Sequence, residues 1–596
     1  MTARSWGLLL AVVVLAACGR DRQPQPQDQL RSDRNGTTRA TESGREDKGD
    51  WFTDRAMETG LDFVHFNGMS GQFYIAEILG PGVALFDYDN DGDLDVYGVQ
   101  GQMLGAGKTV RDALFPPQGP LPLEGRLFRN DLTVHPDGTR TLHFTDVTDR
   151  SGLTSRDYGM GVAAGDFNND GCVDLYLTNF GRNQLFRNNC DDTFTDVSKL
   201  SGTDVVGWSV SAAFVDFDRD GWLDLYVGSY LRYSLEGNTP CFSSAGALGY
   251  CMPRGYQALP GRLFRNRGDG TFADVTAQSR LGSEFGPALG VSTADFNGDG
   301  WMDIYVANDG AENQLWLNQH NGTFKNTALL SGVALPLSGK PEGSMGVDAG
   351  DFDNDGDEDL VMTELAGEGS NLYVNDGTGT FVDRGSQSGL EAASVPYTGF
   401  GTAWLDFDND GWLDILAVNG TVQIIEALRQ AHDPLPLRQR KLLLKNLGNG
   451  RFEDVTDRAG VAFRLSEVGR GAAFGDIDND GDMDVLIGNN NGPLRLLVNN
   501  IGHRKHWIGL RLTGGRGHRD MLGARVEIIR TNQRTLWRRA RADGSYGSAN
   551  DPRVLVGLGD SNEQPRVRVR WPSGRVEEWS AVPLDRYTTL REGSAR

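Results

Sequence analysis

The sequence predicts an all-β protein: a seven-bladed β-propeller with four strands in each blade, followed by a small β-rich domain. The first observation behind this prediction is a loop, D-x-[DN]-x-D-G-x-x-D, which occurs seven times between residues 87 and 484. The second is a short strand on each side of the loops. The third is a hairpin in each unit that leads into an F-x-D-type segment. A unit repeated at this length is typical of a propeller, in which radial repetition also protects the strand edges.

The N-terminus has the pattern of an export signal. Arg4 precedes an apolar run over residues 8–15, which is too short to span a bilayer. The run ends in L-A-A-C, which resembles a bacterial lipobox, so we expect cleavage before Cys18 and lipid attachment to it. Such a lipid anchors a protein at a membrane, and Gly19, by analogy with lipoproteins, favours the outer membrane over the inner one. An ordinary secretory signal with an incidental cysteine is the alternative.

Four segments are expected along the chain. They are a signal peptide over residues 1–17, a tether over 18–50, the propeller over 51–500 and a C-terminal domain over 501–596. The tether is rich in Gln, Pro, Arg, Asp and Gly and has almost no large apolar residue, so it cannot bury enough surface to fold. We expect it to hold the globular part away from the membrane.

Each repeated loop has the chemistry of a calcium site. Side-chain oxygens at positions 1, 3, 5 and 9 and the backbone carbonyl at position 7 can surround one hard cation, and Gly at position 6 permits a sharp turn. Magnesium prefers fewer protein ligands, and no His or Cys side chain stands at a ligand position, which disfavours zinc and copper. The flanks are strands and position 12 is not Glu, unlike an EF-hand. An acidic turn without metal is the alternative, but seven matched copies favour calcium.

The prediction is therefore up to seven structural Ca²⁺ ions, which would change the formal net charge from −23 to about −9. The predicted ligands, with position 7 contributing its carbonyl, are Asp87, Asp89, Asp91, Asp93, Asp95, Asp166, Asn168, Asp170, Cys172, Asp174, Asp216, Asp218, Asp220, Trp222, Asp224, Asp295, Asn297, Asp299, Trp301, Asp303, Asp351, Asp353, Asp355, Asp357, Asp359, Asp406, Asp408, Asp410, Trp412, Asp414, Asp476, Asp478, Asp480, Asp482 and Asp484.

The order of the segments predicts how the ring closes. The first F-x-D segment, at residues 51–54, precedes every loop, whereas the last strand, at residues 494–498, has no such segment after it. We therefore expect these two segments to pair and to complete the seventh blade.

Three connections between the second and third strands of a unit are long, near residues 101–126, 230–261 and 421–440. In a propeller these inserts lie on the face opposite the metal loops, together with the segments that enter each first strand. Binding commonly uses long loops on a rigid scaffold, so we expect a protein or glycan ligand there, with simple capping of the channel as an equal alternative. The third insert has helical spacing over residues 422–429. Candidate residues of the ligand face are Tyr74, Tyr158, Trp208, Phe285, Tyr397 and Glu467.

Four cysteines remain after lipidation, and this even number in an exported protein indicates disulfides. We pair Cys241 with Cys251, which share one insert, and Cys172 with Cys190, which share one blade. Free thiols are the alternative. The C-terminal segment alternates Arg and Val over residues 567–570, which predicts a strand with one wet face. Its arginines either contact an acidic surface, including the propeller, or lie on this solvated face.

The repeats resemble the FG-GAP/VCBS repeats of integrin-α-type propellers. The tail resembles the ASPIC/UnbV domain through G-A-R-V at residues 523–526, G-L-G at 557–559 and V-R-W-P-S-G at 569–574, although G-S-Y-G-S at 544–548 departs from the pattern. Both parts together are similar to the cartilage-acidic-protein-like family. This resemblance implies calcium-dependent extracellular interaction or adhesion.

The leading hypothesis is a calcium-stabilised, membrane-anchored, extracytoplasmic binding or adhesion module at the bacterial cell envelope. The rival hypotheses are a lyase or hydrolase acting on an acidic polysaccharide and a structural component of a surface assembly. The sequence contains neither G-x-S-x-G nor H-E-x-x-H, and no catalytic residue is predicted. Nucleic acid is not an expected partner of an exported acidic chain.

Overall fold

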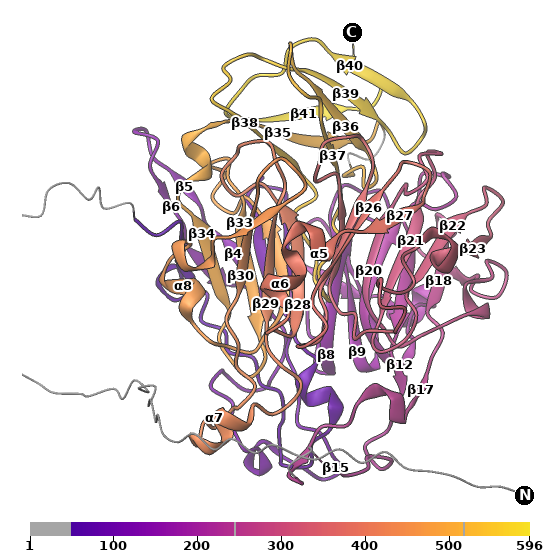
Figure 1. Ribbon diagram of the computed structural model, residues 1–596, viewed down its shortest axis with the longest axis vertical. Coiled ribbons are helices and arrows are strands. Elements are labelled where there is room, and N and C mark those ends of the chain that lie inside the picture. Colours follow the sequence, from indigo (N-terminus) through magenta and orange to yellow (C-terminus); the bar gives the residue numbers. More distant parts are fainter. Residues whose placement is uncertain (1–48, 243–245, 516–518, 596) are drawn as a thin grey trace, which may run out of the picture. The chain divides into compact units, whose positions relative to one another are not determined.

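The computed structural model describes residues 49–242, 246–515 and 519–595. The predicted signal peptide, Cys18 and nearly all of the tether lie outside the described residues. The described part is built mainly from short strands, and its α-helices have only four or five residues (Figure 1). This confirms the predicted all-β, propeller-like fold class. None of the helices in the described part is long and apolar enough to cross a membrane.

Among the described residues, the repeat region forms five four-stranded antiparallel sheets and one eight-stranded sheet in which β9 pairs with β12. Dividing the eight-stranded sheet between β9 and β12 gives seven groups of four strands, and we call each group a blade. In order, they are β2 (Val83–Phe86), β3 (Asp95–Gly98), β4 (Arg126–Asn130) and β7 (Phe144–Asp146); β8 (Tyr158–Gly165), β9 (Asp174–Arg182), β10 (Gln184–Asn188) and β11 (Phe194–Asp196); β12 (Val206–Val215), β13 (Asp224–Ser229), β18 (Arg262–Asn266) and β19 (Phe272–Asp274); β20 (Ala288–Ala294), β21 (Asp303–Asn308), β22 (Gln314–Asn318) and β23 (Phe324–Asn326); β24 (Val347–Gly350), β25 (Asp359–Met362), β26 (Asn371–Asn375) and β27 (Phe381–Asp383); β28 (Gly399–Leu405), β29 (Asp414–Asn419), β30 (Leu442–Asn446) and β31 (Phe452–Asp454); and β32 (Gly469–Gly475), β33 (Asp484–Asn489), β34 (Arg495–Asn499) and β1 (Phe52–Asp54).

The blades close into a ring. Each innermost strand contacts the innermost strand of the next blade, and β32 of the last blade contacts β2 of the first. β1 pairs with β34 with Phe52 opposite Asn499 and Asp54 opposite Leu497, so the predicted closure from both ends of the repeat region is confirmed.

An asparagine at the end of each third strand joins every blade to the preceding one. Its side-chain amide donates to the carbonyl at loop position 8 in its own blade and to the carbonyl at position 2 in the preceding blade. Asn130 of the first blade bonds Ile477 O of the seventh at 2.9 Å, which makes the set circular. Because these amides are buried, their hydrogen bonds hold the loops in register around the ring. The seven residues are Asn130, Asn188, Asn266, Asn318, Asn375, Asn446 and Asn499.

Short elements occupy the outer edge and the inserts. The helices are α1 (Ala56–Thr59), α2 (Thr148–Ser151), α3 (Ser198–Ser201), α4 (Ala328–Ser331), α5 (Gly385–Ser388), α6 (Leu390–Ser394), α7 (Glu426–Gln430) and α8 (Val461–Arg464). The short strands are β5 (Thr133–Val134), β6 (Arg140–Thr141), β14 (Leu231–Arg232), β15 (Cys241–Phe242), β16 (Leu248–Gly249) and β17 (Gln257–Ala258). The helix predicted over residues 422–429 is therefore shorter and begins later, at α7.

The C-terminal strands form two further sheets at one end of the ring, while α7 and β15 lie at the opposite end (Figure 1). One sheet contains β35 (His506–Thr513), β38 (Val554–Gly559) and β41 (Tyr587–Arg591). The other contains β36 (Arg525–Ile529), β37 (Leu536–Arg539), β39 (Arg566–Arg570) and β40 (Val576–Trp579). In β39 the valines are buried and the arginines are wholly or partly exposed, as the alternation predicts.

The connection between β37 and β38 fills the axis of the ring. This segment, residues 541–551, is called the plug segment below, and it contacts the innermost strand of every blade. Its contacts are Ala549 with Val83, Gly547 with Val162 and Ser211, Asp543 with Thr293, Ser545 with Val347 and Ala472, and Tyr546 with Phe400. Tyr546 is fully buried, and its hydroxyl donates to Leu79 O at 2.9 Å. The channel is thus occupied by the protein's own C-terminal domain.

Candidate metal centre

The seven acidic loops share one backbone geometry. Gly at position 6 has a positive φ in every copy, from 87° at Gly300 to 105° at Gly356, which is the sharp turn that the sequence requires there. The position-5 carboxylate accepts the backbone N–H of position 7 in all seven copies. The loops are therefore held in one shape by their own backbone.

The position-9 aspartates have a structural role that the sequence did not reveal. All seven are completely buried, and each accepts the backbone N–H of position 2 of its own loop through one oxygen. The other oxygen accepts the N–H of the inter-blade asparagine. This carboxylate therefore connects the loop to the third strand, and both of its oxygens already accept one hydrogen bond.

Several loop carboxylates have an oxygen that fits a cation. The Oδ1 atoms of Asp87, Asp216 and Asp295 at position 1, and of Asp89, Asp353 and Asp408 at position 3, are buried without a hydrogen-bond partner in the described part of the chain. Ligand oxygens of positions 1, 3 and 9 lie within 4.8 Å of one another in the first and third loops. A buried carboxylate oxygen without a donor is costly unless a cation occupies the space beside it. The residues present thus fit Ca²⁺.

The pKa values of the seven position-1 aspartates are raised, as expected for buried carboxyl groups with other acids beside them. Burial is the largest cause and raises the pKa of Asp87 to about 6 and that of Asp351 to about 8, with the carboxylates at positions 3 and 5 adding to it. The guanidinium groups of Arg511 and Arg538 oppose these two shifts. A bound cation favours the ionised form and so offsets the same burial.

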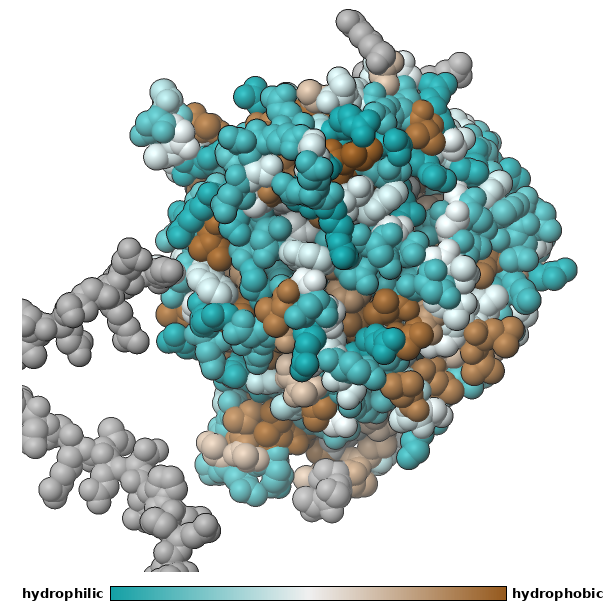
Figure 2. Space-filling view, turned by 45° about the horizontal axis from the view of Figure 1, so that its top comes forward, coloured by the Kyte–Doolittle hydropathy of each residue, from teal (hydrophilic) through white to brown (hydrophobic). Residues whose placement is uncertain are grey.

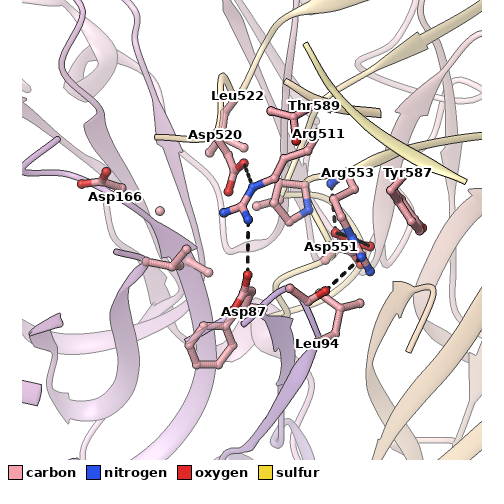
Figure 3. A pocket seen from close by; sticks show the side chains of 18 of the residues that line it. Asp87, Leu94, Asp166, Arg511, Asp520, Leu522, Asp551, Arg553, Tyr587 and Thr589 are labelled. Carbon is pink, nitrogen blue, oxygen red and sulfur yellow. Dashed lines mark hydrogen bonds and ion pairs between the residues drawn. The ribbon is translucent and has the colours of Figure 1, made fainter. Parts of the chain in front are cut away.

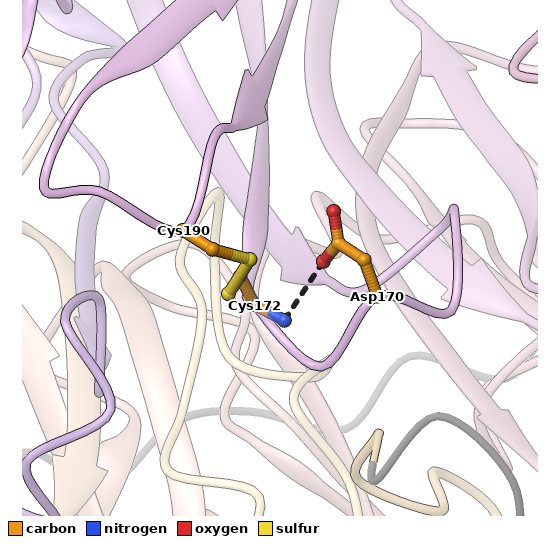
Figure 4. A group of neighbouring side chains, drawn as sticks. All are labelled: Asp170, Cys172 and Cys190. Atoms are coloured by element: carbon orange, nitrogen blue, oxygen red, sulfur yellow. Dashed lines mark hydrogen bonds between the residues drawn. A yellow bond between two sulfur atoms is a disulfide. The ribbon is translucent and has the colours of Figure 1, made fainter.

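Both predicted disulfides are formed, Cys172–Cys190 and Cys241–Cys251. Cys172 is position 7 of the second loop, and Figure 4 shows its N–H pointing to Asp170, at 3.0 Å, while its sulfur is bonded to Cys190. The bridge therefore ties the loop to the hairpin of the same blade and leaves the Cys172 carbonyl as the predicted ligand atom.

Comparisons with known proteins match the two kinds of unit. A family model described as FG-GAP-like repeat matches residues 166–227, 255–306, 295–362, 363–417 and 438–487, and one described as ASPIC and UnbV matches residues 514–596. The chain belongs to the FG-GAP repeat proteins that carry an ASPIC and UnbV domain. The predicted resemblance is therefore confirmed.

Curated relatives of this FG-GAP and ASPIC/UnbV protein include cartilage acidic protein 1 from several vertebrates. The Mus musculus protein is 26% identical over 333 residues, which is 54% of this chain and 48% of the relative. The Xenopus tropicalis protein is 31% identical over 192 residues, which is 31% of this chain and 28% of the relative. The chain thus spans half or less of the length of the curated relatives it matches.

Solved structures with a similar arrangement are distant. A structure on recognition of non-reducing terminal N-acetylglucosamine by an Agrocybe aegerita lectin is 16% identical, with a TM-score of 0.34, and the match covers 60% of this chain and 86% of that one. A Bacillus licheniformis rhamnogalacturonan lyase is 11% identical, with a TM-score of 0.26, and the match covers 70% and 89%. Neither similarity carries an argument about function.

The ASPIC/UnbV domain covers the loop-bearing face of the FG-GAP repeats with basic residues. Arg511 Nη1 lies 3.4 Å from Asp87 Oδ2, and Arg519 Nη2 lies 3.7 Å from Asp216 Oδ2. Arg553 donates to the Asp476 carbonyl at 2.9 Å. These arginines therefore contact the acidic loops of the propeller. The sequence left this possibility open beside a solvated strand face, because it does not indicate which residues distant in the chain become neighbours.

A cavity of about 340 Å³ lies between the first two loops and the ASPIC/UnbV domain. Figure 3 shows Arg511 between Asp520 and Asp87, with Leu522 and Leu94 on the walls. Arg553 lies over the Tyr587 ring, 4.3 Å from its centre. Arg511 pairs with Asp87 and Asp520, and Arg553 pairs with Asp551, so the cavity is part of the contact between the repeats and the C-terminal domain.

In two loops, an Arg or Lys side chain of the same blade lies beside the carboxylates of positions 3 and 5. Arg265 Nε lies 2.6 Å from Asp218 Oδ2 in the third loop, and Lys445 bonds Asp408 and Asp410 in the sixth, the latter at 3.0 Å. Both residues stand directly before the inter-blade asparagine of their blade. They place a positive charge where a calcium ion would bind, so these two loops have an internal competitor.

Replacing Lys445 by Met is therefore expected to strengthen calcium binding at the sixth loop about tenfold, because the variant removes a like charge next to the ion. Competition titrations with a calcium-sensitive chelator measure this change. Leu317 occupies the equivalent position in the fourth blade, so Leu317→Met is the matched control and should leave every affinity unchanged. Equal affinities for Lys445→Met and the wild type would contradict the competition.

The predicted ligand face is only partly a surface. Trp208 is 1% exposed and Tyr158 is 5% exposed, and both pack in the cluster around Tyr546, which corrects the prediction that they face a ligand. Phe285 is 45% exposed, and Tyr74 and Tyr397 are half-buried. Glu467 binds Lys441 and Arg495 and so joins neighbouring strands. The sequence pattern did not show which segments cover these two rings: Phe180, Tyr230 and Tyr233 pack on Trp208, and the Tyr158 hydroxyl donates to backbone carbonyls of the segment 67–76.

Glu77 is a buried carboxyl group that we expect to make the stability of the protein depend on pH. It is 1% exposed, its Oε2 accepts from Tyr250 at 3.2 Å, and burial raises its pKa to about 8. The pKa of Glu77 is higher in the folded state than its unfolded-state pKa near 4.5, so the protonated carboxyl group favours folding. This contribution to stability is fully present below pH 4.5 and is lost as pH rises through about 8.

Glu77→Gln is expected to remove this loss, so its stability relative to the wild type should rise by about 3–5 kcal/mol between pH 5 and pH 9. Denaturant unfolding at several pH values measures the difference. Glu236→Gln, at an exposed position of the second insert, controls for the substitution itself. A constant difference between Glu77→Gln and the wild type over this pH range would show that Glu77 does not titrate in it.

Proposed function

We propose that the protein is a calcium-stabilised, membrane-anchored binding or adhesion module of the bacterial cell envelope, whose ligand is a protein that docks on the insert-bearing face. The proposal is supported by the arrangement of the two faces of the ring. The C-terminal domain covers the loop-bearing face and fills the channel. The insert-bearing face carries no such cover among the described residues and is available to a partner.

The insert-bearing face has the composition of a protein-binding surface. Leu114 and Leu121 of the first insert are 61% and 63% exposed, and Phe242 and Met252 of the second are 66% and 40% exposed. Figure 2 shows the side of the ring with the C-terminal end turned forward, and the larger hydrophobic areas on this side lie in the lower half of the view, toward the insert-bearing end. Exposed apolar side chains on one face favour a protein partner, since a glycan requires polar groups beside its stacking surfaces.

The three inserts form one continuous surface. Asn238 of the second insert donates to Gln72 O at 2.9 Å. Gln72 is close in sequence to Met69, whose carbonyl accepts the backbone N–H of Leu114 in the first insert. Gln423 of the third insert lies 3.7 Å from the Met252 sulfur. A partner protein docked across these contacts would touch all three inserts at once. The closed ring holds the inserts in place, so they would not need to rearrange on binding.

The test is adhesion of beads coated with the protein to envelope proteins in the presence of calcium. A variant with Leu114→Ser, Leu121→Ser and Phe242→Ser is expected to keep its unfolding midpoint and lose adhesion. The matched control replaces three leucines of the outer helices α3 and α4, Leu200, Leu329 and Leu330, by Ser; these leucines are at least as exposed as the three insert residues. Adhesion unchanged in the insert variant would reject the insert surface. Adhesion to isolated polysaccharide but not to protein would indicate a glycan ligand instead.

Membrane anchoring is the second part of the proposal and rests on the L-A-A-C sequence at residues 15–18. Cys18→Ser should move the protein from the membrane fraction to the soluble fraction after cell disruption. The two disulfides support an oxidising compartment. The descriptions of the two matched families name no reaction, and we propose a binding rather than a catalytic role.

A further inference from the structure

A histidine approaches the seventh loop from outside the repeat. His503 lies in the 3₁₀ turn Gly502–Arg504, just after β34. Its Nδ1 lies 2.8 Å from Asp482 Oδ2 and 3.0 Å from Asp480 Oδ2. The three ligand atoms that these side chains offer are all within 4.8 Å of one another. The sequence indicated no histidine ligand, because His503 stands after the last repeated strand and reaches the loop only in the folded chain.

The chain is built to hold this histidine in place. The Cα of Gly502 faces Asp482 so closely that an added Cβ would lie 2.5 Å from the Asp482 Cβ, which no side chain tolerates. The backbone N–H of His503 also donates to Asp482 Oδ2 at 3.0 Å. The glycine therefore permits the close approach that brings the imidazole to both carboxylates.

One acceptor at this cluster remains free. The side chain of Asp482 is 1% exposed, and its Oδ1 has no hydrogen-bond partner within the described residues. Position 7 supplies only its backbone carbonyl to the predicted calcium ion, so this side chain is not required in the calcium loop. A fully buried carboxylate oxygen without a donor indicates an additional ligand beside it.

We propose that His503, Asp480 and Asp482 form a metal site next to the seventh calcium loop and that it takes a divalent transition metal ion such as Zn²⁺. Imidazole nitrogen and carboxylate oxygen are preferred zinc ligands, whereas calcium prefers oxygen alone. Donor atoms of a tetrahedral zinc site lie about 3.3 Å apart. The observed 2.8 and 3.0 Å separations need to widen by only a few tenths of an ångström when the ion replaces the shared proton.

The charge of the loop supports a second cation. The loop has five carboxylates, at Asp476, Asp478, Asp480, Asp482 and Asp484, and one Ca²⁺ cancels two of the five charges. His503 is 39% exposed, so water molecules can complete the coordination of an ion bound there. Asp480 would be shared between the two ions, because its carboxylate has one oxygen on each side: Oδ1 accepts the Asp482 N–H and Oδ2 faces His503.

The experiment is a zinc titration of the full-length protein, with calcium in large excess so that the calcium loops are filled. One zinc ion per chain is expected, bound at least tenfold more weakly by His503→Gln. Cobalt in place of zinc should give visible absorption bands typical of a tetrahedral site, and His503→Gln should abolish them. Unfolding midpoints of both proteins in calcium without zinc show that the variant is folded.

The fourth loop provides the matched control. His320 Nε2 lies 2.9 Å from Asp299 Oδ2, but position 7 of this loop is Trp301, whose ring stacks on the imidazole. His320→Gln should therefore bind zinc like the wild type. Equal zinc affinity of His503→Gln and the wild type would overturn the proposal. So would displacement of zinc by calcium, since that places zinc in a calcium loop. Either result leaves the calcium proposal itself intact, because that depends on the chelation experiment described below.

Discussion

Removing calcium is expected to lower the unfolding midpoint of the protein by on the order of 10–20 °C. The carboxylates at positions 1 and 9 of the seven loops are buried or half-buried, and several loop carboxylate oxygens face no donor within the described residues. An ion present at a hundredfold excess over its dissociation constant stabilises the folded state by about 2.7 kcal/mol. Seven such ions therefore contribute on the order of 20 kcal/mol in total. The expected shift of the midpoint is this free energy divided by the unfolding entropy of the whole protein, which is about 2.1 cal/mol/K for each residue.

Scanning calorimetry in EGTA and then in millimolar calcium measures this shift, and metal counting on the dialysed protein gives the stoichiometry. Magnesium serves as the control and should restore little of the lost stability, since it fits loops with this many protein ligands poorly. Asp351→Asn should reduce the count by one ion. The same midpoint in EGTA and calcium, with no bound metal, would contradict the calcium assignment of all seven loops.

Replacing Tyr546 by Ala is expected to destabilise the protein by about 3–5 kcal/mol, because it empties the centre of the plug segment. The ring packs edge-on against Phe400 with centroids 4.9 Å apart, and the side chain is completely buried. Tyr546→Phe keeps the ring and loses only the hydrogen bond to Leu79 O, so it should cost about 1 kcal/mol.

Denaturant unfolding of both variants, followed by tryptophan fluorescence, tests this order of effects. Val576→Ala is the control, since Val576 lies in the C-terminal domain but is 52% exposed. Limited proteolysis should cut Tyr546→Ala faster between β37 and β38 than it cuts the wild type. Equal stability of Tyr546→Ala and Val576→Ala would mean that the plug segment does not stabilise the ring.

The repeated features of the fold were predictable because the chain encodes them locally. The spacing of the loop residues and the glycine at position 6 predict a sharp turn. The segment at residues 51–54 predicts a strand pairing, because it matches the F-x-D segments of the other units. The positive φ of Gly356 and the pairing of Phe52 with Asn499 agree with those predictions. Both disulfides were predictable for the same reason, since each joins cysteines of one blade or one insert.

Contacts between distant segments were not predictable from such patterns. Tyr158 looks like a surface aromatic in the sequence, but its hydroxyl donates to the carbonyls of Asn67 and Ala76, more than 80 residues earlier in the chain. The arginines of the C-terminal domain alternate like those of a solvated strand, although Arg519 reaches Asp216. The inter-blade asparagines repeat in every unit and give a readable signal. Their role becomes clear only when the preceding blade is in place.

The pairing of β1 with β34 has a consequence for biosynthesis. Residues 52–54 leave the ribosome early, but their partners at residues 497–499 follow more than 400 residues later. The first strand therefore remains without its partner while six blades form, and the last contacts to form are those of highest sequence separation, which slows folding. An exported chain that emerges N-terminus first must keep this strand from aggregating until the ring closes. Its length of only three residues limits the exposed edge during that interval.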